Sequence, residues 1–562
     1  MQRTHNLIWR GESMPVVGYF TAEIGLWSEL HTYSGGLGVL AGDHVKSAAD
    51  AGTPLVGVTL LYHQGYARQH IDGDGIQTET FPEFDPNDHI TKTKTVLKLH
   101  LDGQPLSAYV WKADIVGQSG HIVPVYFIDT RHPANSSEHQ ELSSRLYGGD
   151  DEVRIRQEYV LGVGGVQLFD HLDLELHGLH LNEGHCTFAM LELLNRGWSR
   201  KELAQRSLFT THTPVPAGHD RFEWPLVKEV VGELLPMDAK ELVIAAGDSE
   251  NGRRCSMSHL AVALSTSVNA VSKLNADVAM TMFDEQIIQP ITNGVHHITW
   301  TSPVMASLFD GHLHGWRTQP ETISEADTLP TDALLEARNQ ARQNLREFVL
   351  SKTGVELSSE RLTIGFARRF ATYKRANLVF RDLERLRNIG AGKIQFVFSG
   401  KAHPRDKGGK QLIRDIYDSA EQIAEEIPVA FIENYDMETG LLMTSGVDIW
   451  LNNPIRPMEA SGTSGMKAAM NGVPNCSILD GWWPEACIHG VNGWAIGNAE
   501  NVRDDERDAN NIYQVLEQDV LPLWEGSKDA WAEMMKASIA ASAGFTGHRM
   551  IQDYLDFYNQ FS

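Results

Sequence analysis

The stretch LTIGFARRFATYKR, residues 362–375, decides the fold. Its first six residues form an apolar run of strand length, and the eight that follow carry four positive charges. A strand this apolar indicates a parallel sheet that is covered on both faces. Ligands of open α/β sheets bind beyond the carboxyl ends of the strands, and the charged segment falls at such an end. We therefore expect a binding site directly after this strand.

Similar apolar runs recur along the chain, each followed by a turn and a helix-like stretch. This alternation predicts an α/β fold made of two Rossmann-like, doubly wound domains. The first domain is expected at 1–292, the second at 293–540, and a C-terminal helix at 541–562 is expected to return to the first domain. The predicted strands are Val16–Glu23, Pro54–Tyr62, Ile122–Asp129, Leu208–Thr213, Val278–Met282, Leu362–Ala367, Ile394–Ser399, Val429–Glu433, Val447–Leu451 and Cys476–Leu479.

Composition excludes several classes of function. The 48 basic and 73 acidic residues give a net charge of −25, which opposes nonspecific binding to nucleic acid or to anionic lipid. No run approaches the roughly 20 apolar residues of a membrane-spanning helix, and the first residues contain no signal peptide. The four scattered cysteines fit a reducing compartment, so a cytoplasmic protein is expected. No group of side chains has metal-ligand spacing, and we predict no metal.

Three loops are candidates for chemistry. The first, YSGGLG at 33–38, leads into a helix, where glycine amides would form an anion site or simply a tight corner. The second, RRFATYKR at 368–375, is either a phosphate site or a solvated helix start. The third, EASGTSGMK at 459–467, exposes amides and hydroxyls at a helix start and places Lys467 one turn further on. A Walker spacing is absent, which favours a Schiff-base lysine over a P-loop lysine or an exposed lysine.

At this point the chain resembles the glycogen, starch and maltodextrin phosphorylases, most closely their shorter bacterial and archaeal members. The run 459–467 looks like the cofactor-lysine motif of that family. The resemblance extends from about residue 16 to about residue 500. Seven further segments follow the family's order: YSGGLGVLAGDHVKSAAD (33–50), HLNEGH (180–185), TTHTP (210–214), TNGVHHITW (292–300), RRFATYKR (368–375), SGKAHPRDKGGK (399–410) and NYD (434–436).

The resemblance implies a GT-B type glycosyltransferase architecture with two domains facing a central cleft. It implies reversible phosphorolysis of the non-reducing-end glucose of an α-1,4-glucan, glycogen, starch or maltodextrin, to α-glucose 1-phosphate with retention of configuration. The implied cofactor is pyridoxal 5′-phosphate on Lys467, whose phosphate relays a proton to the substrate phosphate. The implied partners are the α-glucan, inorganic phosphate and glucose 1-phosphate, and homodimerisation is expected from the resemblance alone.

The resemblance also implies residue roles, each carried over by its motif. Arg369, Lys374 and the amide of Gly36 would hold the substrate phosphate. His212 and Asn293 would contact the sugar 6-hydroxyl, whereas Glu459 and the amides after it would hold the 3-hydroxyl. The implied catalytic residues are His212, Arg369, Lys374 and Lys467. The implied substrate-binding residues are Gly36, Leu37, His212, Asn293, Arg369, Lys374, Glu459 and Ser461, and the cofactor-binding residues are Trp300, Tyr435, Gly462, Thr463, Ser464 and Lys467.

Other interpretations remain open at this stage. A nucleotide-sugar glucan synthase of the same architecture shares the glycine loop and the basic pair but has no cofactor lysine. A glucan-binding regulatory protein with a degenerate site is the second alternative. His185 is interpreted as a core histidine, and the adjacent Trp482 and Trp483 would either stack on sugar rings or pack in the core. Asp436 stands where longer relatives carry a basic residue.

Overall fold

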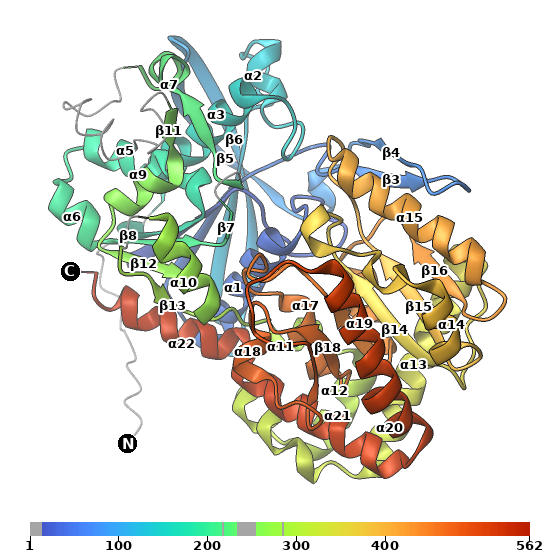
Figure 1. Cartoon of the computed structure of the whole chain (residues 1–562). Coiled ribbons are helices and arrows are strands. Elements are labelled where there is room, and N and C mark those ends of the chain that lie inside the picture. Colours follow the sequence, from blue (N-terminus) through green and yellow to red (C-terminus); the bar gives the residue numbers. More distant parts are fainter. Residues whose placement is uncertain (1–13, 173, 216–217, 233–253, 284–285, 562) are drawn as a thin grey trace.

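The structure, a computed structural model, describes residues 14–172, 174–215, 218–232, 254–283 and 286–561. Figure 1 shows two halves side by side, each built on its own sheet. The predicted strand at 362–367 forms β14 (Leu362–Ala367), all six residues of which are buried. Its sheet is parallel throughout and has the order β16-β15-β14-β17-β18-β19. In chain order this is 3-2-1-4-5-6, the order of a Rossmann fold. The other strands are β15 (Ile394–Ser399), β16 (Val429–Ile432), β17 (Ile449–Asn452), β18 (Asn475–Ile478) and β19 (Gly493–Ile496).

The first half contains a nine-stranded sheet with the order β13-β12-β9-β8-β1-β2-β7-β6-β5. Its seven parallel strands follow the same winding, with β1 and β8 side by side at the centre. Strands β5 and β6 extend one edge in antiparallel fashion. The strands are β1 (Met14–Thr21), β2 (Leu55–Leu60), β5 (Thr91–Leu101), β6 (Gln104–Val116), β7 (Ile122–Asp129), β8 (Leu174–Asn182), β9 (Ser207–Thr211), β12 (Ser267–Ala270) and β13 (Gln289–Pro290).

Helices cover both faces of each sheet, as the apolar strands predicted. Successive side chains of a strand point to opposite faces. Val16 and Phe20 of β1 therefore belong to one core cluster, whereas Val17 and Tyr19 belong to another. The helices of the first half are α1 (Gly36–Ala51), α2 (Ser137–Glu141), α3 (Asp151–Tyr159), α4 (Gly165–Leu168), α5 (Phe188–Asn195), α6 (Arg200–Gln205), α7 (Trp224–Val231), α9 (Met257–Ala263) and α10 (Lys273–Met282). The predicted doubly wound α/β fold is confirmed.

The second half contains α11 (His297–Trp300), α12 (Pro303–His312), α13 (Thr331–Thr353), α14 (Leu383–Gly390), α15 (Lys407–Ile423), α16 (Met437–Gly446), α17 (Thr463–Met470), α18 (Trp483–Ala486), α19 (Asp505–Val515), α20 (Leu521–Glu525) and α21 (Lys528–Ser542), and the last helix of the chain is α22 (Gly547–Tyr558). Two small hairpins lie outside the main sheets, β3 (Arg68–Ile71) with β4 (Gln77–Thr80), and β10 (Arg221–Glu223) with β11 (Arg254–Ser256). Across the described ranges, every helix is too short or too polar to cross a membrane.

One predicted strand is wrong. Residues 278–282 form the second half of α10, whose N-cap Ser272 accepts a hydrogen bond from the amide of Asn275. The buried residues Asn275, Ala276 and Ala279 have helical spacing, and alanine and methionine favour helices. The neighbouring strand is instead β12, which together with β8 was not predicted, because its mixed polar residues do not form an apolar run.

The last helix lies against the first half of the chain. Figure 1 shows α22, coloured red, beside the blue and green elements, and its residues Met550, Ile551 and Tyr554 join the core cluster of α1. The chain therefore passes between the halves twice. The two crossings lie side by side, because Val295 donates to the carbonyl of Phe545 and accepts from the amide of Gly547.

Candidate active site

Four loops meet at the centres of the two sheets, where the winding direction reverses. They follow the central strands β1, β8, β14 and β17 and span residues 22–35, 183–187, 368–375 and 453–462. This reversal is where ligands bind in open α/β folds, because the loops on either side of it diverge. Most of the residues singled out from the sequence lie in these loops or in the first turn of the helices that follow them.

The glycine loop ends in an exposed helix N-terminus. Helix α1 begins at Gly36, so Gly36 and Leu37 both lie in its first turn, where backbone amides have no partner inside the helix. A Cβ atom at Gly36 would contact nothing within 4 Å, whereas one at Gly38 would lie 2.6 Å from Glu23 Oε2. Glu23 accepts a 2.5 Å hydrogen bond from the amide of Ser34. Glu23 thus holds the loop in place, and the exposed first turn at Gly36 leaves room for an anion beside the helix N-terminus.

The candidate cofactor lysine lies one turn into α17. The N-cap of this helix is Gly462, in the left-handed conformation at φ 83°, which favours glycine. Lys467 is buried with 6% exposure, and its Nζ lies 3.6 Å from the centroid of the Trp300 ring. Burial lowers the pKa of Lys467 to about 8, although the nearby Asp43 opposes the shift. The lysine is therefore a buried amine whose uncharged form is more populated near neutral pH than that of an ordinary lysine.

Two residues of α1 complete the surroundings of this lysine and were not found from the sequence. Asp43 accepts hydrogen bonds of 2.8 and 2.9 Å from the indole Nε1 of Trp300. Lys46 lies one turn further along and donates to Thr299 Oγ1 over 3.3 Å. Burial lowers the pKa of Lys46 and raises that of Asp43. Their positions seven and ten residues after Gly36 place them two and three turns along the same helix, which is the signal that could have identified them.

A charge cluster forms around Glu459. Lys374 donates to both carboxylate oxygens of Glu459, over 2.9 and 2.7 Å, and Arg368 donates to Oε2. Although burial acts in the opposite direction, Arg368 and Lys374 lower the pKa of Glu459 to about 2. Arg368, the neighbour of the predicted phosphate ligand Arg369, is the arginine that pairs with Glu459. Arg369 itself is exposed and lies near Tyr373 and Tyr66, whose influence outweighs desolvation and raises its pKa.

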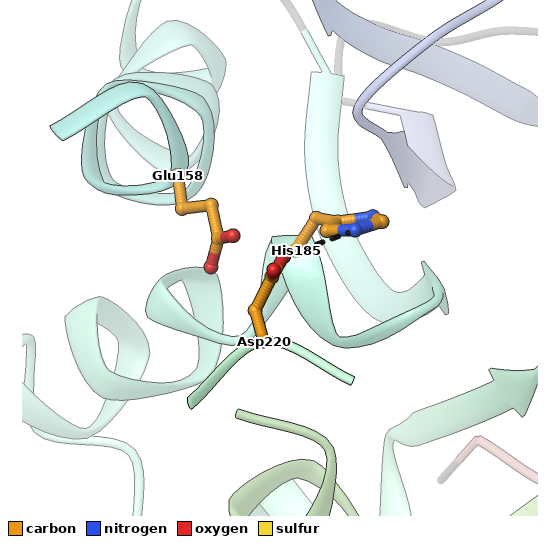
Figure 2. Close-up of side chains that lie close together, drawn as sticks. All are labelled: Glu158, His185 and Asp220. Carbon is orange, nitrogen blue, oxygen red and sulfur yellow. Dashed lines mark ion pairs between the residues drawn. The ribbon is translucent and has the colours of Figure 1, made fainter. Parts of the chain in front are cut away.

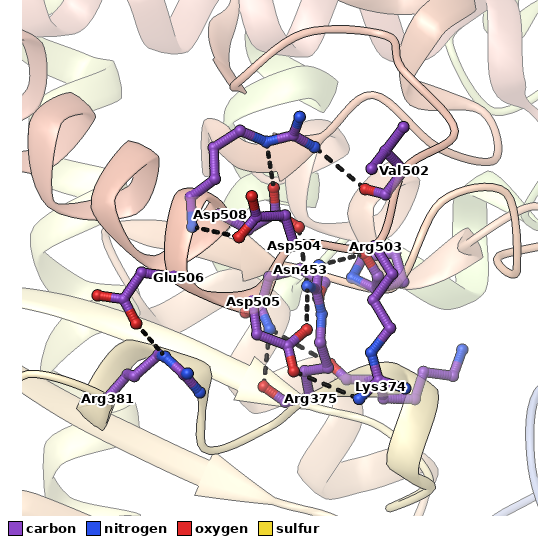
Figure 3. Close-up of polar contacts among 12 residues, drawn as sticks. Lys374, Arg375, Arg381, Asn453, Val502, Arg503, Asp504, Asp505, Glu506 and Asp508 are labelled. Atoms are coloured by element: carbon purple, nitrogen blue, oxygen red, sulfur yellow. Dashed lines mark hydrogen bonds and ion pairs between the residues drawn. The ribbon is translucent and has the colours of Figure 1, made fainter.

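The backbone after Lys374 is fixed by a second set of ion pairs, shown in Figure 3. Arg375 has a left-handed φ of 50° and pairs with Asp505 and Asp508 at the start of α19. The side-chain amide of Asn453 donates to the carbonyls of Lys374 and Arg375. The backbone of Lys374 is thus fixed by Asn453, and its ammonium group is positioned separately by Glu459.

His212 lies at the end of β9 with its backbone and ring both fixed. Its amide donates to Glu183 Oε2 over 2.8 Å, and its Nε2 lies 2.6 Å from Asn182 Oδ1. Burial lowers the pKa of His212 to about 4, so the ring is neutral at pH 7. Because an amide oxygen accepts, Nε2 carries the proton and Nδ1 is left as an acceptor. Glu183 has a left-handed φ of 75°, a strained conformation consistent with a functional role.

The remaining predicted residues show which positions are still open to a ligand. Asn293 Oδ1 and Ser461 Oγ are buried and have no hydrogen-bond partner among the described residues. Thr463 and Ser464 form the first turn of α17, and Ser464 Oγ accepts from Trp450. Orphaned polar atoms, a helix N-terminus and a buried lysine together fit a phosphate-bearing aldehyde cofactor. Tyr435 directly precedes Asp436, which caps α16 by accepting from the amide of Thr439.

A separate cluster contains Glu158, His185 and Asp220, drawn in Figure 2. His185 is buried, as expected, and pairs with Asp220 over 3.2 Å. Among the described residues these three side chains have the spacing of metal ligands. However, Arg154 pairs with Asp220 at 2.9 Å and with Glu158 at 3.4 Å, and burial raises the pKa of Glu158 well above its usual value. A guanidinium thus supplies the positive charge, and we interpret the cluster as a structural ion-pair network.

Two doubly wound sheets with their central loops gathered around a buried lysine define a glycosyltransferase architecture of the GT-B type. A family model described as carbohydrate phosphorylase matches residues 220–485. The maltodextrin phosphorylase of Thermococcus litoralis is 39% identical, over 97% of this chain and 70% of its own length. Glycogen phosphorylases of Mycobacterium tuberculosis and Aquifex aeolicus are 36% and 35% identical, over 70% and 86% of their lengths. The chain belongs to the carbohydrate phosphorylase family, whose members are generally dependent on pyridoxal phosphate.

Proposed function

We propose that this chain is an α-1,4-glucan phosphorylase that transfers the non-reducing-end glucosyl group of a glycogen, starch or maltodextrin chain to inorganic phosphate. The observation that carries this proposal is the place of Lys467, which is buried against Trp300 one turn beyond the half-buried N-terminus of α17. The reaction breaks the bond between C1 and the glycosidic oxygen, forms a bond from C1 to phosphate with retention, and returns a proton to the shortened glucan. We propose 1–292 and 293–540 as its two domains, with 541–562 returning to the first.

The residues that would hold the cofactor are Lys467 through its amine and Gly462, Thr463 and Ser464 through the first turn of α17. Trp300 and Tyr435 would contact its ring. When bound, pyridoxal phosphate supplies a phosphate group that relays a proton to the substrate phosphate. The lowered pKa of Lys467 raises the uncharged fraction of the amine near neutral pH above that of an ordinary lysine, which favours covalent attachment.

The substrate phosphate would be held by Arg369, Lys374 and the amides of Gly36 and Leu37. An ammonium group has three donors, and Lys374 uses two of them on Glu459, so one remains for a phosphate oxygen. The net charge of −25 opposes the approach of a phosphate dianion, and these clustered donors would offset that repulsion at the site.

The glucosyl group would be oriented by hydrogen bonds to its hydroxyls. Glu459 is ionised and retains acceptor capacity for the 3-hydroxyl, beside Ser461. The free Nδ1 of the neutral His212 and the unpartnered Oδ1 of Asn293 are acceptors, and the 6-hydroxyl, which has one proton, would donate to one of them. These contacts position C1 without a carboxylate pair of the kind that glycoside hydrolases use.

The test is a phosphorolysis assay on the purified protein, together with its absorbance spectrum before and after borohydride reduction. We expect α-glucose 1-phosphate from phosphate and maltodextrin, and a reduced cofactor on Lys467 by mass spectrometry. Activity with a nucleotide sugar and none with phosphate would instead support the glucan synthase alternative, which none of the relatives' names favours. All four cysteines are free, in keeping with a cytoplasmic setting.

A further inference from the structure

The segment DGWWPE, residues 480–485, lies between the two parts of the candidate site. Its tryptophans do not face a ligand, since Trp482 and Trp483 are each 1% exposed. Their ring centroids lie 5.2 Å apart, and Trp482 also packs edge-on against Phe545 at 4.8 Å. Of the two sequence interpretations, core packing is therefore the one the structure supports. This core anchors the polar residues at the two ends of the segment.

The first end of the segment holds the backbone at Glu459. Asp480 is fully buried, and its Oδ2 accepts a 2.9 Å hydrogen bond from the amide of Glu459, while its Oδ1 accepts from the amide of Gly481. Two residues on, the amide of Trp482 donates to the carbonyl of Ser461 over 2.8 Å. The loop that carries the candidate 3-hydroxyl contacts is thus hydrogen-bonded to this segment at Glu459 and at Ser461.

The second end reaches the other half of the chain. The carboxylate of Glu485 accepts from Thr292 Oγ1 over 3.0 and 2.8 Å and from the amide of Lys273 over 2.9 Å. Its side chain is only 11% exposed, so these bonds are shielded from water. Thr292 directly precedes Asn293, the candidate contact for the 6-hydroxyl. Glu485 therefore fixes the backbone from which Asn293 projects.

A third set of contacts closes the connection. The turn between β12 and α10 accepts from the amide of Asn293 through the carbonyl of Val271, over 3.0 Å. In the next residue, Ser272 Oγ donates to the carbonyl of Ala460 over 2.7 Å. Two connections therefore join the loops of Asn293 and Glu459. One runs through the turn at 271–272, and the other runs through the segment 480–485. Displacing either end changes the spacing between the two hydroxyl contacts.

We infer that Glu485 and Asp480 are positioning residues for glucosyl recognition: Glu485 acts through Thr292 on Asn293, and Asp480 acts through the backbone of Glu459. The inference rests on the proposed function. Neither carboxylate contacts the sugar. Each sets the position of one acceptor group, and small displacements of such groups weaken a hydrogen bond steeply because of its geometric requirements.

The experiment measures kcat/KM in the direction of glucan synthesis for α-glucose 1-phosphate and for its 6-deoxy and 3-deoxy analogues. The wild-type enzyme discriminates against both analogues, because each leaves a buried polar group without a partner. In Glu485→Gln, whose amide N–H₂ group meets the donors of Thr292 and Lys273, discrimination against the 6-deoxy analogue should fall by roughly tenfold. In Asp480→Asn the loss should instead affect the 3-deoxy analogue.

The control is Glu192→Gln, which removes another buried carboxylate, one that pairs with Arg196 on its own helix. It should leave both discrimination ratios unchanged. Melting temperature and cofactor content show whether each variant is folded. A further variant, Thr292→Val, removes the hydrogen bond between Thr292 and Glu485 by changing Thr292 instead. The effects of Thr292→Val and Glu485→Gln should not add. Equal losses for all three substrates, or unchanged ratios in folded variants, would overturn the inference. Absence of synthesis by the wild-type enzyme would overturn the proposed function itself.

Discussion

The Nζ atom of Lys467 lies directly over the ring of Trp300, 3.6 Å from its centroid, while the indole N–H of Trp300 donates to Asp43. The aromatic face favours the charged ammonium, and Asp43 favours it further, yet burial outweighs both and leaves the pKa at about 8. The lysine is therefore stabilised in place as a cation but needs little free energy to lose its proton. Both properties suit an amine that forms an imine with an aldehyde in a buried site.

Removal of the lysine tests the proposed cofactor attachment. Lys467→Ala should contain no cofactor that borohydride fixes to the protein and should lose turnover, because it removes the amine that lies over the Trp300 ring. Absorbance, fluorescence and mass spectrometry after reduction measure this. The exposed Lys352→Ala is the matched control and should behave as wild type. Full activity of Lys467→Ala would contradict the mechanism.

The charge of Asp43 should set the pH at which the apoprotein takes up the cofactor. Asp43 raises the pKa of Lys467 and Lys46 lowers it. Asp43→Asn should thus shift the midpoint of the uptake rate to lower pH, and Lys46→Met should shift it to higher pH. Stopped-flow absorbance of the apoprotein mixed with pyridoxal phosphate measures both midpoints. Shifts in the same direction for the two variants would refute this electrostatic interpretation.

Neutralising Glu459 should reduce activity and change acid stability. Glu459→Gln leaves two buried cations without their counter-charge and removes a sugar contact, so kcat/KM should fall by about a hundredfold or more. The pKa of Glu459 is lowered from 4.5 to about 2, so its stabilising contribution is present above pH 4.5 and is lost as the pH falls towards 2. Urea unfolding between pH 6 and pH 3 should therefore show a weaker pH dependence in the variant. Identical slopes would contradict it.

Asp480 should make the protein less stable as the pH rises through neutrality. Burial and the facing charge of Glu459 raise the pKa of Asp480 from 3.8 to about 7, while Arg456 acts in the opposite direction. Because the folded state favours the protonated form, its contribution is fully present below pH 3.8 and is lost as the pH rises through about 7. Asp480→Asn should lose less unfolding free energy than wild type between pH 5 and pH 8. Parallel stability curves would show that Asp480 does not titrate in this range.

The last helix should contribute to stability through one hydroxyl group. Tyr558 Oη lies 2.6 Å from His180 Nδ1 and 3.2 Å from His44 Nε2, all within a buried cluster. Tyr558→Phe leaves both imidazoles short of a partner, so unfolding free energy should fall by about 1–3 kcal/mol. Denaturant unfolding measures the change. Tyr109→Phe keeps the ring that Lys92 contacts and serves as the control; an equal effect in both variants would exclude a specific role.

The apolar strands made the fold predictable, but not all of it. β14 and β15 are buried on both faces, and their predominantly apolar runs match the structure residue for residue. β8 contains His177, His180 and Asn182, whose polar groups are satisfied by partners distant in sequence, so no local pattern marks it as a strand. The helix at 278–282 was mistaken for a strand because a short apolar run fits either structure.

The candidate site was predictable where a motif is local and not where partners come from elsewhere. Lys467, Glu459 and Lys374 were found from glycine-rich and basic runs, and their functional roles remain predictions. Arg368 could not be separated from Arg369, because adjacent residues after a strand point in different directions that only the fold decides. Glu485 has no local signal, since its partner Thr292 lies 193 residues away, and for Asp43 the only local signal is its spacing from Gly36 along α1, because its partner Trp300 lies 257 residues away.

The paired chain crossings at Val295 and Phe545 couple the two connections between the halves. Because the two linkers are hydrogen-bonded to each other, a displacement of one is transmitted to the other. A Cβ atom at Gly294 would lie 2.1 Å from the carbonyl oxygen of Thr546, so a larger side chain there would push the linkers apart. Because Asn293 adjoins these linkers, a change in their spacing would also displace the proposed 6-hydroxyl contact.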